Sequence, residues 1–197
     1  MVSTITRMKA PSRREQLLDA AKAVVADEGF HGVSIEAVAR RAGITRPIVY
    51  RHFEDLAALL EALVERETVR ALGQLQEFLP RDLGGDPREA LIAALRGYLR
   101  AVESDPVTWR LMLVPAEGAP GLLGERIAAG RAAVIAQLGG AIDSPDPELT
   151  ARALSSLADE AARLLLADRE RYPAERSLDH GRWLLFSAAR QTGLGMP

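Results

Sequence analysis

The hydrophobic and polar positions along the chain repeat with the period of an α-helix. Apolar residues recur every three to four positions, and the sequence has no β-branched or aromatic runs with a period of two. The pattern therefore predicts an all-α protein of about nine helices. They are expected at residues 12–28, 34–42, 46–53, 55–78, 87–104, 106–114, 121–139, 147–168 and 177–191.

Aspartate followed by proline marks three of these helix starts. Proline has no N–H to lose in a first turn, and the aspartate caps the free amides and suits the positive end of the helix dipole. Ser12 with Glu15 has the spacing of a capping box, which predicts another start there. The three pairs are Asp86-Pro87, Asp105-Pro106 and Asp146-Pro147.

The composition narrows the class of protein. The chain has 197 residues, of which 48% are hydrophobic and 26% charged, so it suits one large domain or two small ones. Because it has no cysteine, disulfides, thiolate catalysis and cysteine-bound zinc are excluded. No apolar run approaches the ~18 residues that span a bilayer, and the first twenty residues lack a signal-peptide core. We expect a cytoplasmic protein without a membrane partner.

The charge is divided unevenly. Residues 1–53 carry nine Lys/Arg against five Asp/Glu, a net of +4, whereas residues 54–197 carry 16 against 22, a net of -6; together they give the overall -2. A basic head on an acidic body indicates a polyanionic partner at one end. Ordinary variation of the surface charge is the alternative.

Residues 34–53, SIEAVARRAGITRPIVYRHF, have the layout of a helix-turn-helix broken at Gly43. Glycine takes a positive φ at such a turn without penalty, and the small Ala39 lets the second helix cross closely. A helix-turn-helix that binds no DNA is the alternative. We expect an inner face of Ile35, Val38, Ile44, Val49 and Phe53, and polar positions at Arg40, Arg41, Arg46, Arg51 and His52.

The run GFHGVSIEAVARRAGITRPIVYRHFEDLAALLEAL, residues 29–63, resembles the TetR (tetracycline repressor) family of transcriptional regulators. The resemblance implies a homodimer with two N-terminal three-helix DNA-binding heads on a helical core that holds an effector pocket. It divides the chain into a helix-turn-helix DNA-binding domain, residues 1–53, and an effector-binding and dimerisation domain, residues 54–197.

The resemblance also assigns roles at the DNA. Ser34 would cap the second helix and aim its amides at a phosphate, and Thr45 would cap the recognition helix. Arg46 suits either a guanine edge or a phosphate, and Tyr50 either a phosphate or a half-buried core position. The basic residues before the first helix suit a DNA-binding arm or a solvated terminus. The expected DNA-binding residues are Ser34, Thr45, Arg46, Pro47, Tyr50, Arg51, His52, Lys9 and Arg13.

Two departures from the family pattern predict operator binding that is weaker or that depends more on the basic arm. Leu56 stands where the family often has a lysine that touches the DNA backbone. Ile35 and Glu36 stand where family members often have a hydroxyl and sometimes a base-reading cation. One phosphate contact and some base readout are therefore expected to be missing.

By the same resemblance, residues 147–168 and 177–191 would pair with their symmetry mates as a four-helix dimer interface, with an intramolecular core as the alternative. The middle helices would wall a pocket for a hydrophobic or aromatic small molecule, although residues at helical spacing also suit a simple core. The expected pocket residues are Phe78, Tyr98, Trp109, Met112 and Leu113.

The function predicted is a ligand-responsive repressor that binds a palindromic operator as a homodimer and is released by a small-molecule effector. A helical adaptor with lost or weak DNA binding and a small helical enzyme are the alternatives. The sequence gives little support to an enzyme, because His31, His52 and His180 lie far apart and there is no His-Glu-x-x-His or glycine-rich phosphate loop. We expect no enzymatic activity, cofactor or metal.

Overall fold

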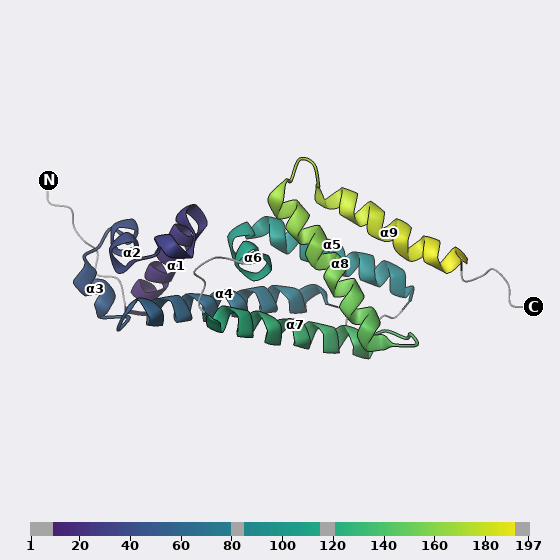
Figure 1. Ribbon diagram of the computed structural model, residues 1–197, viewed down its shortest axis with the longest axis horizontal. Helices are drawn as coiled ribbons and strands as arrows, with labels where there is room; N and C mark the ends of the chain where they lie inside the picture. The colour runs from purple at the N-terminus through teal and green to yellow at the C-terminus, as the bar shows by residue number, and fades with distance from the viewer. Residues whose placement is uncertain (1–9, 80–84, 115–120, 192–197) are drawn as a thin grey trace, which may run out of the picture. The chain divides into compact units, whose positions relative to one another are not determined.

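The computed structural model describes residues 10–79, 85–114 and 121–191, and every regular element among these residues is helical (Figure 1). The prediction of an all-α protein is confirmed. The described residues form α1 (Ala10–Glu28), the short 3-10 helix η1 (Phe30–Gly32), α2 (Ile35–Ala42), α3 (Arg46–Tyr50), α4 (Leu56–Phe78), α5 (Pro87–Ser104), α6 (Pro106–Leu113), α7 (Gly121–Ala141), α8 (Pro147–Ala167) and α9 (Ala174–Gln191).

The three Asp-Pro helix starts are confirmed. In each, the aspartate is the N-cap residue and its carboxylate accepts a hydrogen bond from an amide of the first turn. The nitrogen-to-oxygen distances are 2.9 Å from Arg88 to Asp86, 3.3 Å from Thr108 to Asp105 and 3.0 Å from Leu149 to Asp146.

Several other helix ends differ from the expected ones by two or three residues. Helix α1 begins at Ala10, so Ser12 lies inside it and forms no capping box with Glu15. The reason is Pro11, which is tolerated in a first turn and lets the helix start earlier. Helix α9 begins at Ala174, directly after Pro173, rather than at residue 177, and α3 ends at Tyr50 rather than at 53.

Contacts between residues divide the chain into two compact units. Unit 1 comprises residues 1–67 and 116–126, and unit 2 comprises residues 68–115 and 127–197. Helix α4 contributes to both units, since Glu67 and Thr68 are consecutive residues within it. Unit 1 thus extends beyond residue 53, where the sequence pattern placed the end of the DNA-binding domain.

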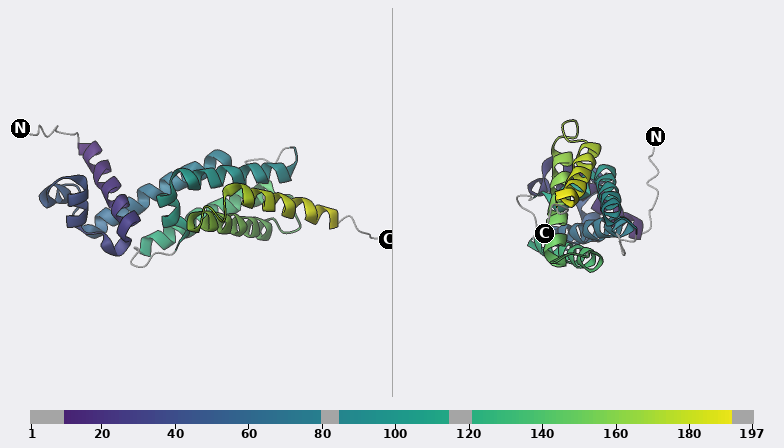
Figure 2. Two further views of the ribbon diagram at one scale, coloured as in Figure 1. Left: turned by 90° about the horizontal axis from the view of Figure 1, so that it is seen from above. Right: turned by 90° about the vertical axis from the view of Figure 1, so that its right-hand side faces the viewer.

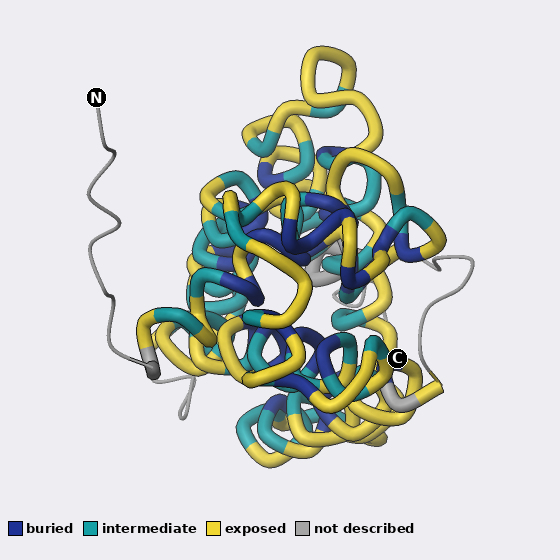
Figure 3. Tube along the Cα trace, turned by 90° about the vertical axis from the view of Figure 1, so that its left-hand side faces the viewer, coloured by how far each residue is buried: buried dark blue, intermediate teal, exposed yellow. Residues whose placement is uncertain are grey.

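In unit 1, α1 packs closely against α2 and η1, and α2 packs against α3. Buried and exposed residues alternate along the trace (Figure 3). The buried side chains of these short helices and of the first half of α4 are mainly apolar. Removal of these side chains from water is the main force that stabilises unit 1. The most deeply buried are Leu17, Leu18, Val38, Val49, Leu59 and Leu63.

In unit 2, α5 packs against α8 and α9, and α6 packs against α5 and α8 (Figure 2). Close approach depends on glycine at one point: a Cβ at Gly97 would lie 2.5 Å from the Cβ and Cγ atoms of Phe78. The main core of the unit contains Ala71, Ile92, Tyr98, Leu99, Val102, Trp109, Leu113, Ala162, Leu165 and Leu178.

None of the helices among the described residues combines the length and the apolar character that crossing a membrane requires.

Candidate nucleic-acid interface

The turn between α2 and α3 has the geometry that the sequence predicts. Helix α2 starts after Ser34, whose Oγ accepts a hydrogen bond of 3.0 Å from the amide of Ala37. It ends at Gly43, which has φ +67° and whose N–H is directed to the carbonyls of Ala39 and Arg40. This left-handed conformation explains the glycine, since other residues adopt it only with strain.

Helix α3 begins with Arg46 and Pro47, and its position is fixed by Val49, which is completely buried. Thr45 occupies the N-cap position, but its side chain makes no capping hydrogen bond, so that part of the prediction was wrong. Thr45 has extended backbone angles, which a cap residue adopts whether or not its side chain bonds to the first turn.

The predicted inner face of the motif is confirmed. Ile35, Val38, Val49 and Phe53 are buried, and Ile44 is half-buried. These side chains come from α2, from α3 and from the turns beside it. They hold α3 on α2 and leave its other side open to solvent.

The open side of α3 carries polar, basic and aromatic groups. Tyr50 is 49% exposed, and His52 is half-buried. Within the described part of the chain, no ion pair engages Arg46 or Arg51. The residues exposed along this surface are Thr45, Arg46, Pro47, Tyr50 and Arg51.

Near the start of α1, the side chains of Gln16 and Arg14 contact residues of the helix-turn-helix. Arg13 donates a hydrogen bond to Gln16, whose amide nitrogen donates in turn to the carbonyl of Ala42 over 3.3 Å. The guanidinium of Arg14 lies 4.9 Å from the centre of the Phe53 ring. Arg7 and Lys9 lie outside the described residues. Arg13 and Arg14 lie within α1, so the prediction that they belong to an arm before the first helix was wrong.

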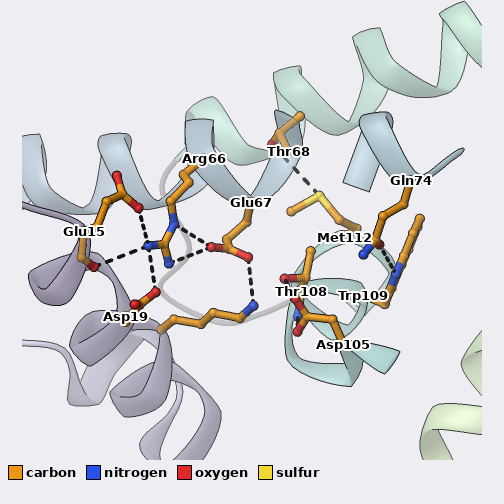
Figure 4. A network of polar contacts seen from close by, with 11 residues as sticks. Glu15, Asp19, Arg66, Glu67, Thr68, Gln74, Asp105, Thr108, Trp109 and Met112 are labelled. Carbon is orange, nitrogen blue, oxygen red and sulfur yellow. Dashed lines mark hydrogen bonds and ion pairs between the residues drawn. The ribbon is translucent and has the colours of Figure 1, made fainter. Parts of the chain in front are cut away.

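The polar cluster between α1 and α4, which sequence reasoning missed, also belongs to unit 1 (Figure 4). Arg66 reaches Glu15 at 3.0 Å, Asp19 at 2.8 Å and Glu67 at 2.8 Å, and Lys22 lies 2.9 Å from Glu67. Burial alone would lower the pKa of Arg66, but the hydrogen bond to Glu15 and the neighbouring carboxylates outweigh it and raise that pKa. The Arg66 guanidinium therefore stays charged at neutral pH.

The five residues expected to wall a pocket are brought together in unit 2. Tyr98, Trp109 and Leu113 belong to its buried core, and Phe78 and Met112 pack against that core from partly buried positions. The Tyr98 and Trp109 rings meet edge to face with centroids 5.0 Å apart. The Tyr98 hydroxyl donates to Asp159 over 3.0 Å, and the Trp109 indole N–H donates to Gln74 over 3.1 Å.

A hollow of about 370 Å³ lies elsewhere in unit 2, between the start of α5, the end of α7, the start of α8 and α9. None of the five expected pocket residues lines it. Its walls include Pro87, Leu91, Ile142, Thr150, Leu154 and Leu185. Among the described residues, no group of histidine, aspartate and glutamate side chains has an arrangement that could hold a metal ion.

Helices α8 and α9 expose large apolar side chains to solvent. Leu149 and Leu157 of α8 are 63% and 56% exposed, and Trp183 and Leu184 of α9 are 59% and 37% exposed. The Trp183 ring is stacked on His180, with centroids 5.5 Å apart. Such a concentration of exposed apolar groups on two helices is typical of a protein interface.

The buried α2–α3 junction, the glycine turn and the exposed basic face of α3 together define a helix-turn-helix protein with an additional helical unit. Comparison with known proteins gives the family. Residues 17–63 match the family model of bacterial regulatory proteins of the tetR family. Residues 17–63 of the chain therefore form the helix-turn-helix domain of the TetR family.

Curated relatives match about half of the chain. It is 31% identical over 106 residues to the HTH-type transcriptional activator FasR of Mycolicibacterium smegmatis, an alignment that covers 54% of this chain and 48% of FasR. It is 39% identical over 88 residues to the HTH-type transcriptional regulator BetI of Yersinia pestis, covering 44% of each protein. The chain thus spans about half the length of the curated relatives it matches.

Solved structures extend the likeness to most of the chain. A TetR-like transcriptional regulator from Rhodococcus sp. RHA1 is similar with a TM-score of 0.72 and 26% identity. That similarity covers 93% of this chain and 99% of the Rhodococcus chain. The helical part after the helix-turn-helix therefore follows the same fold as a regulator of this family.

Proposed function

We propose that this protein is a transcriptional repressor that binds a palindromic DNA operator as a homodimer and is released by a small-molecule effector. The observation that carries the proposal is the exposed face of α3, on which Arg46 and Arg51 stand beside Tyr50, with Val49 anchoring the opposite side. The net charge of +4 on residues 1–53 supports a polyanionic partner for this face.

The exposed groups have the chemistry that a major groove needs. A guanidinium at Arg46 donates two hydrogen bonds to the O6 and N7 atoms of a guanine, which discriminates between bases by about 1–3 kcal/mol. Tyr50 and His52 would donate to phosphates, and Ser34 would present the first amides of α2 to another phosphate. Thr45, Pro47, Arg51, Lys9 and Arg13 complete the proposed DNA-binding set.

The proposal of a homodimer rests on α8 and α9. A second copy would cover the exposed apolar side chains of Leu149, Leu157 and Trp183 by packing the same two helices against them. Two recognition helices held about 34–36 Å apart would then enter successive major grooves. Because the proposed dimer would bind chromosomal DNA, we expect it in the cytoplasm.

The effector is proposed to bind among the middle helices of unit 2. A solved complex titled SmeT-Triclosan has 25% identity to this chain and a TM-score of 0.68, so a regulator of this fold accepts a small molecule. Phe78, Tyr98, Trp109, Met112 and Leu113 would contact a hydrophobic or aromatic compound here. Its tighter binding to one arrangement of the heads would lower operator affinity by linkage.

The test is a selection of random duplexes by the purified protein, followed by titration of the enriched sequence at two salt concentrations. A palindrome whose affinity falls steeply with salt is expected. Arg46→Ala should weaken operator binding about 5- to 150-fold, the equivalent of about 1–3 kcal/mol, without unfolding the protein. Arg169→Ala, at an exposed position in the turn after α8, is the matched control and should bind as the unaltered protein does.

Enrichment of no sequence, or equal operator binding by Arg46→Ala and the unaltered protein, would contradict the proposal. In that case a helical adaptor without specific DNA binding becomes the better description. This chain has Leu56 and Glu36 at two positions where relatives can carry cations. We therefore expect its affinity for an operator to be lower than that of relatives with cations at both positions.

A further inference from the structure

The ion cluster of unit 1 joins two helices that are distant in the sequence. Glu15, Asp19 and Lys22 follow one another at helical spacing along a single side of α1, opposite Arg66 and Glu67 of α4. Figure 4 shows Glu15 and Asp19 on either side of the Arg66 guanidinium, with Glu67 next to it. Arg66 and Lys22 therefore each have a carboxylate partner on the other helix.

Glu67 is the unusual member of this cluster. Its side chain is 0% exposed, and it is held between Lys22, which is 15% exposed, and Arg66, which is 11% exposed. Removing a carboxylate and two cations from water is costly, and apolar side chains of similar size would fill the same space at least as favourably. Stability alone therefore gives no reason for this arrangement.

The buried ion cluster can instead be explained by the specific geometry that it imposes on the packing of α1 against α4. Apolar contacts such as those of Leu17 and Leu63 tolerate small slips between helices, whereas a buried carboxylate is satisfied only where both cations reach it. A slip of α1 by one turn would move Lys22 away from Glu67 and leave a buried charge with one partner fewer. The cluster thus favours one register of α1 on α4.

The register of α1 also sets the position of the helix-turn-helix. The neighbour of Glu15 on α1 is Gln16, which donates to the carbonyl of Ala42 at the end of α2, directly before Gly43. The same helix therefore binds α4 through its charges and the α2–α3 turn through an amide. A displacement of α1 would shift the support of the recognition helix.

We propose that Lys22, Arg66 and Glu67 are positioning residues for operator recognition: their buried ion contacts hold α1 in the register that presents α3 correctly to DNA. This inference rests on the proposed function, because it concerns the same DNA-binding face. These residues lie outside the proposed DNA-binding set. The proposal is that they nevertheless help the protein to discriminate the operator from random sequence.

The test replaces the buried pair by apolar residues without changing the net charge. In the double variant Lys22→Met/Glu67→Leu, Arg66 keeps Glu15 and Asp19 as partners. The matched control is Arg169→Met/Glu103→Leu, which removes an ion pair of unit 2 that lies outside α8 and α9 and is also neutral overall. For each protein, the melting temperature, the affinity for the selected operator and the affinity for a random duplex are measured.

We expect the double variant to melt at or above the temperature of the unaltered protein and to bind the operator at least about tenfold more weakly. Its affinity for random duplex should change less than about threefold, since the backbone contacts are unaltered. A merely structural role would not change the ratio of these affinities in a folded protein. The control should match the unaltered protein in all three measurements.

The single variant Glu67→Gln tests the proposal even if the double variant does not fold. It keeps the shape and one acceptor oxygen of the side chain. We expect it to lose operator affinity at least about threefold with random binding unchanged. Operator binding equal to that of the unaltered protein, or unfolding of both variants, would overturn the positioning role. Absence of an operator for the unaltered protein would instead overturn the proposed function itself.

Discussion

Tyr98 of α5 donates its hydroxyl hydrogen to the carboxylate of Asp159 on α8, with 3.0 Å between the oxygens. Arg131 of α7 contacts the other carboxylate oxygen of Asp159 at 2.6 Å. Three helices of unit 2 are therefore joined at one carboxylate that is mostly shielded from water. The Tyr98 ring adds an edge contact to Trp109, so the same residue takes part in both polar and aromatic packing.

Removal of the Tyr98 hydroxyl should weaken unit 2. In Tyr98→Phe, the ring contacts remain but Asp159 loses one donor in a largely buried position, and the free energy of unfolding at pH 7 should fall by about 1 kcal/mol. Urea denaturation followed by circular dichroism measures the difference. Tyr172→Phe, in the turn before α9, is the control and should leave the free energy of unfolding unchanged within error. Equal stability of all three proteins would contradict a stabilising role for the hydrogen bond from Tyr98 to Asp159.

Because of the same hydroxyl group, we expect the free energy of unfolding to fall at high pH. Burial, followed by the charge of Asp159, raises the pKa of Tyr98 well above the value of about 10 for a free tyrosine. Between these two pKa values the unfolded chain releases a proton that the folded chain keeps, so the stability falls as pH rises. The contribution is fully present below about pH 10. The advantage of the unaltered protein over Tyr98→Phe should shrink as the pH rises from about 9 to about 11.

Two glycine substitutions should have opposite effects. At Gly43, φ is +67° and no neighbouring atom lies within 4 Å of the place that a Cβ would take, so Gly43→Ala costs only backbone strain, about 1–2 kcal/mol. Gly73 is exposed within α4 and equally open, so Gly73→Ala should stabilise the protein by up to about 1 kcal/mol. Thermal or urea unfolding of both variants checks the two signs, and a gain in stability at Gly43 would refute the turn geometry.

The N-cap of α8 is open to a direct test. Asp146→Ala removes the acceptor for the Leu149 amide and should lower the free energy of unfolding by about 1 kcal/mol. Asp146→Asn keeps a capping oxygen and should retain most of that free energy. If alanine and asparagine at this position prove equivalent in chemical denaturation, the carboxylate contributes nothing as a cap.

The proposed dimer makes a prediction about Trp183. Trp183→Ser should weaken self-association about 30-fold or more, since large aromatic side chains at the centre of an interface contribute about 2 kcal/mol or more. Sedimentation equilibrium measures the dissociation constant. Val69→Ser, which removes a side chain that is 60% exposed on α4, is the control and should leave it unchanged. A monomeric unaltered protein would contradict the proposed dimer.

Local chemistry explains which features the sequence predicted. The pairs of aspartate and proline at α5, α6 and α8 fix helix starts within a few residues, and a glycine between two short amphipathic helices fixes the turn at Gly43. Ser12 misled the prediction because Pro11 allows α1 to begin earlier. The contacts of Arg66 with Glu15 and Asp19 had no signal in the sequence, because these ion pairs join residues that become neighbours only through tertiary packing.

The close approach of α4 and α5 has a consequence for how the protein can vary. A methyl group at position 97 would overlap Phe78, whose Cβ and Cγ atoms would lie 2.5 Å away. Positions 97 and 78 are therefore expected to change together in related sequences: alanine at 97 should accompany a smaller residue at 78, and a large aromatic ring at 78 should accompany glycine at 97. Alanine at 97 with Phe78 kept would push apart two helices of the unit proposed to receive the effector.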